Sequence, residues 1–171
     1  MVLELILVPK ALVNALQPWS DFYSHSKTAA AVVTYLHVGG LLLAGGLAIA
    51  ADRGSLRALR LAAGERSHYL RELASVHRWV LTGLTVVVAS GIALLTADIE
   101  TFFGSWIFWT KMVLVALLLA NGVRMTRVED ALRRDASAES AHWQSLHRVA
   151  VTSLGLWFVI AAFGVALANY S

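Results

Sequence analysis

The sequence predicts an all-α membrane protein, a four-transmembrane-helix bundle with an interfacial N-terminal helical segment. Hydrophobic residues make up 58% of the 171 residues and charged residues only 15%, a balance that leaves too little polar surface for a soluble domain. The apolar residues also gather into blocks that approach the roughly 20 residues needed to cross a bilayer. The predicted spans are 28–51, 76–97, 105–124 and 147–170.

The N-terminal part of the chain is predicted to lie along the membrane surface. Its first eight residues are nearly all apolar, but Glu4 interrupts the run and Pro9 ends it, so the stretch is too short to span. It also lacks the basic flank of a signal peptide. Trp19 begins an aromatic group of the kind that marks a membrane interface. We therefore divide the chain into an interfacial segment, 1–27, and a four-helix domain, 28–171.

The connections between the spans predict the topology. Residues 52–72 and 124–142 are polar and suited to short or partial helices, and 98–104 is predicted to be a tight turn with only acidic charges. Because cytoplasmic connections are enriched in Lys and Arg, we expect both termini outside the cytoplasm of a cell (inner) membrane. This asymmetry explains most of the net charge of +3, so no nucleic-acid partner is expected. The arginines lie in or beside the first and third connections: Arg53, Arg57, Arg60, Arg66, Arg71, Arg78, Arg124, Arg127, Arg133, Arg134 and Arg148.

Two short repeats, Val-His-Arg and Leu-His-Arg, open the second and fourth spans. They place His77 and His147 at similar depths, where two imidazoles could bind the iron of one b-type haem from opposite faces. Arg78 and Arg148 would then pair with the haem propionates. The alternative is that these residues are the His and Arg commonly found where helices enter the headgroup region.

Two further ionisable residues lie inside the predicted spans. His37 is either a structural histidine hydrogen-bonded between helices or a functional residue beside a stripe of small side chains. Lys111 either extends to the outer surface or faces the bundle and needs a partner, and His37 belongs to the same outer half of the membrane. Asn121 lies deeper and is suited to a hydrogen bond between helices.

Several kinds of site are excluded or absent. The chain has no cysteine, which excludes disulfides, Cys-ligated iron–sulfur clusters, covalent c-type haem and thiolate metal sites. It also has no Gly-rich phosphate loop and no catalytic arrangement of Ser, His and Asp. No catalytic residue is therefore predicted.

A family resemblance involves two of the four spans. The stretch Tyr-Leu-His-Val-Gly-Gly at 35–40 resembles the start of a helix in copper-resistance-D-like membrane proteins, and Trp-Thr-Lys-Met at 109–112 with Asn121 resembles their later Lys-to-Asn helix. This group is similar to the small membrane protoporphyrinogen oxidase family, which uses a histidine and a lysine and is associated with haem. The resemblance implies roles for His37 and Lys111. The chain departs from the copper proteins in having only three methionines, so it lacks a Met-rich copper path.

Three functions follow from these features. The first is a b-type haem protein for transmembrane electron transfer, with His77 and His147, or His37, as ligands. The second is a non-catalytic accessory subunit that packs against a larger membrane complex, and the third is a small transporter, which the absence of carboxylates within the predicted spans disfavours.

Small residues nearly encircle the first span and predict a protein partner besides membrane lipid. Such residues let a second helix approach closely. We expect contacts with another membrane protein, or with a second copy, through the first span and the N-terminal segment. The residues concerned are Gly39, Gly40, Ala44, Gly45, Gly46, Ala48 and Ala50 in the span, and Val2, Leu3, Leu5 and Ile6 before it.

Overall fold

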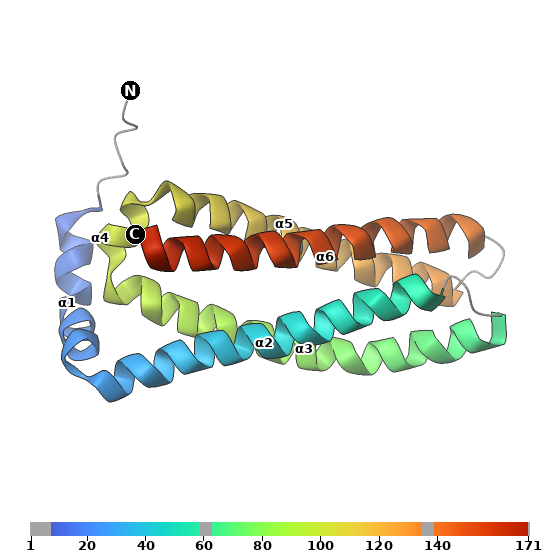
Figure 1. The fold of residues 1–171 in the computed structure, drawn as a ribbon, viewed down its shortest axis with the longest axis horizontal. Coiled ribbons are helices and arrows are strands. Elements are labelled where there is room, and N and C mark those ends of the chain that lie inside the picture. The colour runs from blue at the N-terminus through green and yellow to red at the C-terminus, as the bar shows by residue number, and fades with distance from the viewer. Residues whose placement is uncertain (1–7, 59–62, 135–138, 171) are drawn as a thin grey trace, which may run out of the picture.

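The computed structural model describes residues 8–58, 63–134 and 139–170, and this part of the chain forms six α-helices without a strand (Figure 1). Four of the helices are long and apolar enough to cross a membrane. The predicted fold class is therefore confirmed, while the apolar strip predicted within residues 1–7 lies outside the described residues. The helices are α1 (Lys10–His25), α2 (Lys27–Ala58), α3 (Ala63–Ala97), α4 (Ile99–Gly104), α5 (Trp106–Arg134) and α6 (Glu139–Tyr170).

The membrane helices continue beyond the apolar blocks. α2 runs on to Ala58, α3 begins at Ala63, and α5 extends to Arg134, so the polar connections are largely parts of the spanning helices. These segments are rich in Ala, Leu, Arg and Glu, which favour helix. A helix that has already formed also extends at little cost. The helices predicted for these connections are therefore continuous with the spanning helices, and they bring polar residues into the bundle.

The predicted turn at 98–104 instead contains a short helix. Asp98 caps α4 by accepting a hydrogen bond from the Thr101 backbone N–H at 3.3 Å. Ser105 does the same for α5, where its Oγ accepts from the Phe108 N–H at 3.4 Å. These two caps satisfy helix N–H groups that have no partner within the helix, and they turn the chain from α3 into α5.

α1 lies across one end of the bundle, beside α4 and the C-terminus (Figure 1). The indole Nε1–H of Trp19 donates to the Ala93 carbonyl at 2.9 Å, and the Ser20 hydroxyl donates to the Ala97 carbonyl at 2.6 Å. Both acceptors belong to the last two turns of α3, and the Ala97 carbonyl is one of those that lack an N–H partner within the helix. The N-terminal segment is thus a helix fixed to the end of α3, and we refer to this end as the α1 end.

The four long helices pack as two hairpins. α2 lies along α3 and α5 along α6, the two hairpins meet mainly where α2 contacts α6, and α3 touches α5 over a short stretch. Apolar side chains fill the interior in three groups along the bundle. From the far end to the α1 end, these are Ala58, Met125, Trp143, Leu146 and Val149; then Ala44, Leu118, Trp157 and Ile160; and then Ile107, Phe108 and Leu167.

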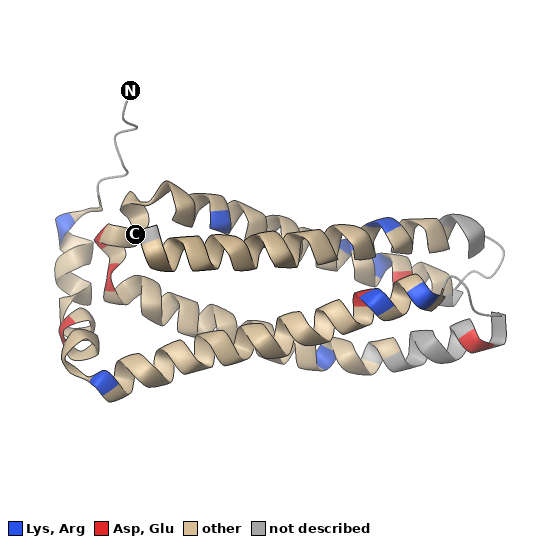
Figure 2. Ribbon diagram, in the orientation of Figure 1, with Lys and Arg blue, Asp and Glu red and all other residues tan. Residues whose placement is uncertain are grey.

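Charge divides the bundle into two ends (Figure 2). The α1 end has mixed charge, with the exposed acids Asp21, Asp98 and Glu100 and the exposed lysines Lys10 and Lys27. We call the opposite half the arginine end. Its described and exposed arginines are Arg53, Arg57, Arg78, Arg124, Arg127 and Arg148.

The small residues of α2 face largely into the bundle. A Cβ atom placed at Gly40 would lie 2.9 Å from Val87 Cγ2 of α3, and one at Gly83 of α3 would lie 2.9 Å from the backbone N of Ala44. Gly45 is covered by the Trp157 ring of α6. The close approach predicted for a partner is therefore made within the chain at these positions, while Gly39 and Gly46 border open space.

Replacing Gly40 by Leu is expected to lower the stability of the bundle. The added side chain must displace α3, and such overpacking typically costs about 1–3 kcal/mol. Gly39→Leu is the matched control, because a side chain at Gly39 meets no atom within 4 Å. Thermal unfolding in detergent measures the difference. Equal melting temperatures for the two variants would contradict the α2–α3 packing described here.

Candidate functional site

His37 of α2 is held against α3 by one side of its imidazole. Its Nδ1 lies 3.1 Å from the Val87 carbonyl oxygen and 3.2 Å from Ser90 Oγ. The Ser90 hydroxyl donates its proton to the Val86 carbonyl at 2.6 Å, so it can only accept from the imidazole. Nδ1 therefore carries a proton, and in the neutral ring the lone pair lies on Nε2. No hydrogen bond to Nε2 occurs among the described residues.

A glycine makes room for this ring. A Cβ atom placed at Gly91 would lie 3.2 Å from Cε1 and 3.6 Å from Nδ1 of His37. The distance to Cε1 is shorter than nearly all Cβ contacts found in proteins, so a larger residue at position 91 would displace the imidazole. Ser90 and Gly91 thus fix the position of His37 together, one by a hydrogen bond and one by leaving space.

Lys111 of α5 extends toward α6 and not along the outside of the bundle. A Cβ atom placed at Gly164 would lie 3.6 Å from its Nζ. The side chain is half-buried, and no carboxylate pairs with it among the described residues. Its charge acts electrostatically on His37. Lys111 therefore faces the bundle and does not extend to the outer surface.

His37 and Lys111 form the candidate site, together with the two glycines that make room for them. Each of the four long helices contributes one of these residues: His37 from α2, Gly91 from α3, Lys111 from α5 and Gly164 from α6. The imidazole has a nitrogen lone pair that can bind a metal ion or a proton. The ammonium, which has no carboxylate partner among the described residues, can pair with a negatively charged group. The site is therefore suited to a ligand that offers both.

His77 and His147 have different surroundings in the structure. His77 Nδ1 lies 3.7 Å from Glu129 Oε2 of α5 and 3.4 Å from the Leu73 carbonyl oxygen. His147 is exposed on α6, and Arg78 and Arg148 are exposed as well. Within the described part of the chain, no group of three or more His, Asp or Glu side chains is arranged to hold a metal ion. The repeated His-Arg pairs therefore occupy different environments.

Two carboxylates that the sequence placed outside the spans are buried at the arginine end. Asp52 of α2 and Glu129 of α5 are each 3% exposed. Both follow closely after an apolar block. Because charged residues, Arg53 and Asp130, stand next to them, these stretches were predicted to be polar connections outside the spans. The available signal was helical spacing, because Ala44, Ala48 and Asp52 lie four residues apart on one face of α2.

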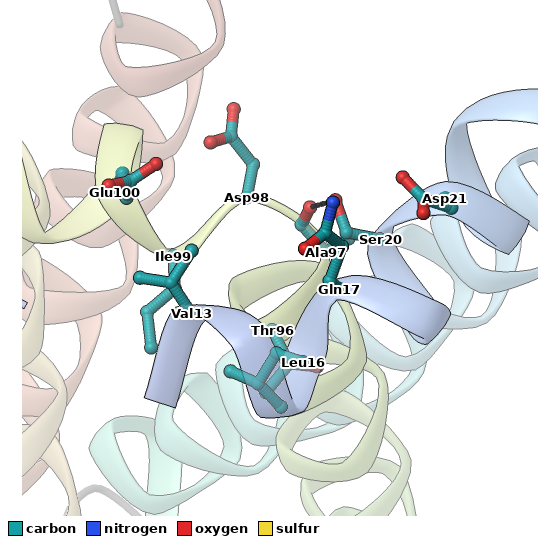
Figure 3. A pocket seen from close by; sticks show the side chains of 10 residues that line it. All are labelled: Val13, Leu16, Gln17, Ser20, Asp21, Thr96, Ala97, Asp98, Ile99 and Glu100. Carbon is teal, nitrogen blue, oxygen red and sulfur yellow. Dashed lines mark hydrogen bonds between the residues drawn. The ribbon is translucent and has the colours of Figure 1, made fainter. Parts of the chain in front are cut away.

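A shallow crevice of about 220 Å³ lies between α1 and the α3–α4 junction (Figure 3). Its polar lining consists of Gln17, Ser20 and Asp21 of α1 with Thr96, Asp98 and Glu100. The carboxylates are exposed, and the Ser20 hydroxyl is already used by the Ala97 carbonyl. The crevice is therefore the solvated seam of the α1 end.

Asn121 connects the second hairpin internally. Its Nδ2 donates to the Val149 carbonyl of α6 at 2.9 Å, and the side chain is buried. This is the structural hydrogen bond expected of a deep amide.

Comparisons with known proteins identify no relative. No family model matches the chain, and neither a curated protein nor a solved structure matches it.

Lys111→Met is expected to raise the stability of the protein. An ammonium within a spanning helix costs up to about 3 kcal/mol on insertion scales, and methionine fills a similar volume without charge. Lys27→Met, at an exposed position, is the control and should leave stability unchanged. Unfolding in detergent compares the two variants. A marked loss of stability in Lys111→Met would indicate that the ammonium has a stabilising partner.

Proposed function

We propose that this multi-pass membrane protein binds a tetrapyrrole of the b-type haem class at His37 and Lys111 and serves in transmembrane electron transfer. The observation that carries the proposal is the arrangement of His37, whose Nδ1 proton is held by α3 while Nε2 keeps its lone pair. Metal-binding histidines have this arrangement, in which a backbone carbonyl fixes the tautomer and the orientation of the ring.

The residues at the site fit the chemistry of such a cofactor. His37 would supply a neutral nitrogen ligand to the iron, and Lys111 would pair with a propionate. Bound haem supplies a one-electron couple. The chain itself orients the imidazole through Ser90 and makes room for both side chains at Gly91 and Gly164. The resemblance to haem-associated proteins that use a histidine and a lysine supports the same pair.

An accessory subunit is the second candidate. The outward face of α2 favours it, because Gly39 and Gly46 border open space beside the exposed Leu42 and Leu43. A helix of a larger membrane complex, or of a second copy, could approach closely there. In that case, His37 and Lys111 would bind no cofactor and the purified protein would be colourless.

The absorption spectrum of the protein purified from haem-replete cells tests the first candidate. We expect a haem spectrum that is lost or strongly changed in His37→Ala and weakened in Lys111→Met. His147→Ala is the control, because that side chain is exposed, and it should keep the spectrum. A colourless wild-type protein would overturn the haem proposal and favour the accessory subunit. A spectrum that depends on His77 and His147, and not on His37, would move the ligand site to the arginine end.

We also propose that the protein lies in the cell (inner) membrane with both termini outside the cytoplasm. The concentration of arginine at one end of the bundle supports this orientation, because Lys- and Arg-rich connections remain cytoplasmic.

Reporter fusions test this topology. A reporter fused after Ser171 is expected to be active on the outer side, and one inserted near Ser137 is expected to be active in the cytoplasm. An Asp98 fusion serves as an internal control and should agree with the C-terminal one, because α4 and the C-terminus lie at the same end (Figure 1). The opposite pattern would place the α1 end in the cytoplasm.

A further inference from the structure

Two buried acids and a histidine lie together at the arginine end, on three different helices. Asp52 of α2 and Glu129 of α5 are each 3% exposed, and His77 of α3 interacts with both. A carboxylate removed from water is costly unless it is paired, hydrogen-bonded or protonated. The partners of each acid therefore determine what this cluster can do.

Asp52 has few partners. Its carboxylate interacts with the Ser153 hydroxyl of α6 and, electrostatically, with His77. Its Oδ2 is fully buried without a hydrogen bond among the described residues. A proton on this carboxyl group would remove the charge that burial makes unfavourable.

His77 links the two acids and also contacts the outside. Its Nδ1 lies 3.7 Å from Glu129 Oε2, and its side chain is 30% exposed whereas that of Glu129 is 4% exposed. An imidazole can bind a proton at one ring nitrogen and release one from the other. His77 is therefore the member of the cluster that can exchange protons with the aqueous phase.

The charged groups around the cluster point mostly outward. Arg53 and Arg57 on α2, Arg78 on α3, Arg127 and Asp130 on α5, and Arg148 on α6 are exposed, and His142 of α6 is half-buried. Among these groups, His77 acts electrostatically on Asp52. A proton on Asp52 would be a counter-charge supplied within the bundle.

We propose that Asp52, His77 and Glu129 form a proton-binding site at the arginine end of the bundle. His77 takes a proton from hydronium in the aqueous phase, leaving water, and the imidazolium passes it to one of the two carboxylates. The imidazole returns to its neutral form, and the acid becomes neutral within the bundle. The site does not depend on a tetrapyrrole at His37 and Lys111, and it gives the chain the ionisable interior that proton-coupled membrane proteins require.

Infrared difference spectroscopy of the full chain in phosphatidylcholine vesicles tests the site. Between pH of about 8 and about 5, histidine titrates but exposed carboxylates remain ionised. We expect a protonated-carboxyl C=O band to appear on acidification and to be lost or reduced in Asp52→Asn or Glu129→Gln. Glu100→Gln, at an exposed position of α4, is the matched control and should keep the band.

The role of His77 needs a kinetic measurement. His77→Gln should still show the band at equilibrium, but the band should appear at least about tenfold more slowly after a pH jump, because a proton relay is lost. An unchanged rate would overturn the role of His77 as the entry point. If Asp52→Asn fails to fold, ¹³C-labelled aspartate in the wild-type chain identifies the band by its isotope shift. No band in the wild type, or a band unaffected by both acid substitutions, would overturn the proposal.

Discussion

The need to satisfy polar groups without water governs this bundle. In a hydrocarbon surrounding, a donor or acceptor must find its partner within the protein. His37 does so at the Val87 carbonyl, Asn121 at the Val149 carbonyl and Trp19 at the Ala93 carbonyl. Each of these bonds joins two helices, so the same hydrogen bonds that satisfy the polar groups also set how the helices are placed.

The fold class could be predicted from the sequence because the lengths of the apolar blocks and the distribution of arginines are strong signals. It placed four spans and identified His37 and Lys111 as a possible pair. It could not show that α2 and α5 continue as helices to Asp52 and Glu129, because polar residues beside an arginine look the same in a loop and in a helix. The positions of Gly91 and Gly164 depend on contacts between helices, which a single sequence does not reveal. The repeated His-Arg pairs also could not show that His77 would be partly buried beside Glu129 while His147 would be exposed, because this difference arises from packing between helices.

The inner charged groups differ in sign between the two ends of the bundle. At the α1 end, the inward-facing charge is the Lys111 ammonium, and the exposed groups include Asp98 and Glu100. At the arginine end, the inner groups are Asp52 and Glu129 beneath a surface of arginines. The two ends therefore differ in the sign of their buried or half-buried charge, and each inner group depends on partners within the bundle.

The hairpin arrangement has a consequence for how the chain is made. Each hairpin pairs helices that are neighbours in sequence, and such local contacts form early and quickly. During synthesis, α2 and α3 can pair as they leave the ribosome, which places His37 against Ser90 before Lys111 has been translated. The glycine that receives Lys111 belongs to α6, the last helix to emerge. A nascent chain can thus form the first hairpin early, and the lysine acquires its final surroundings only after α6 has been translated.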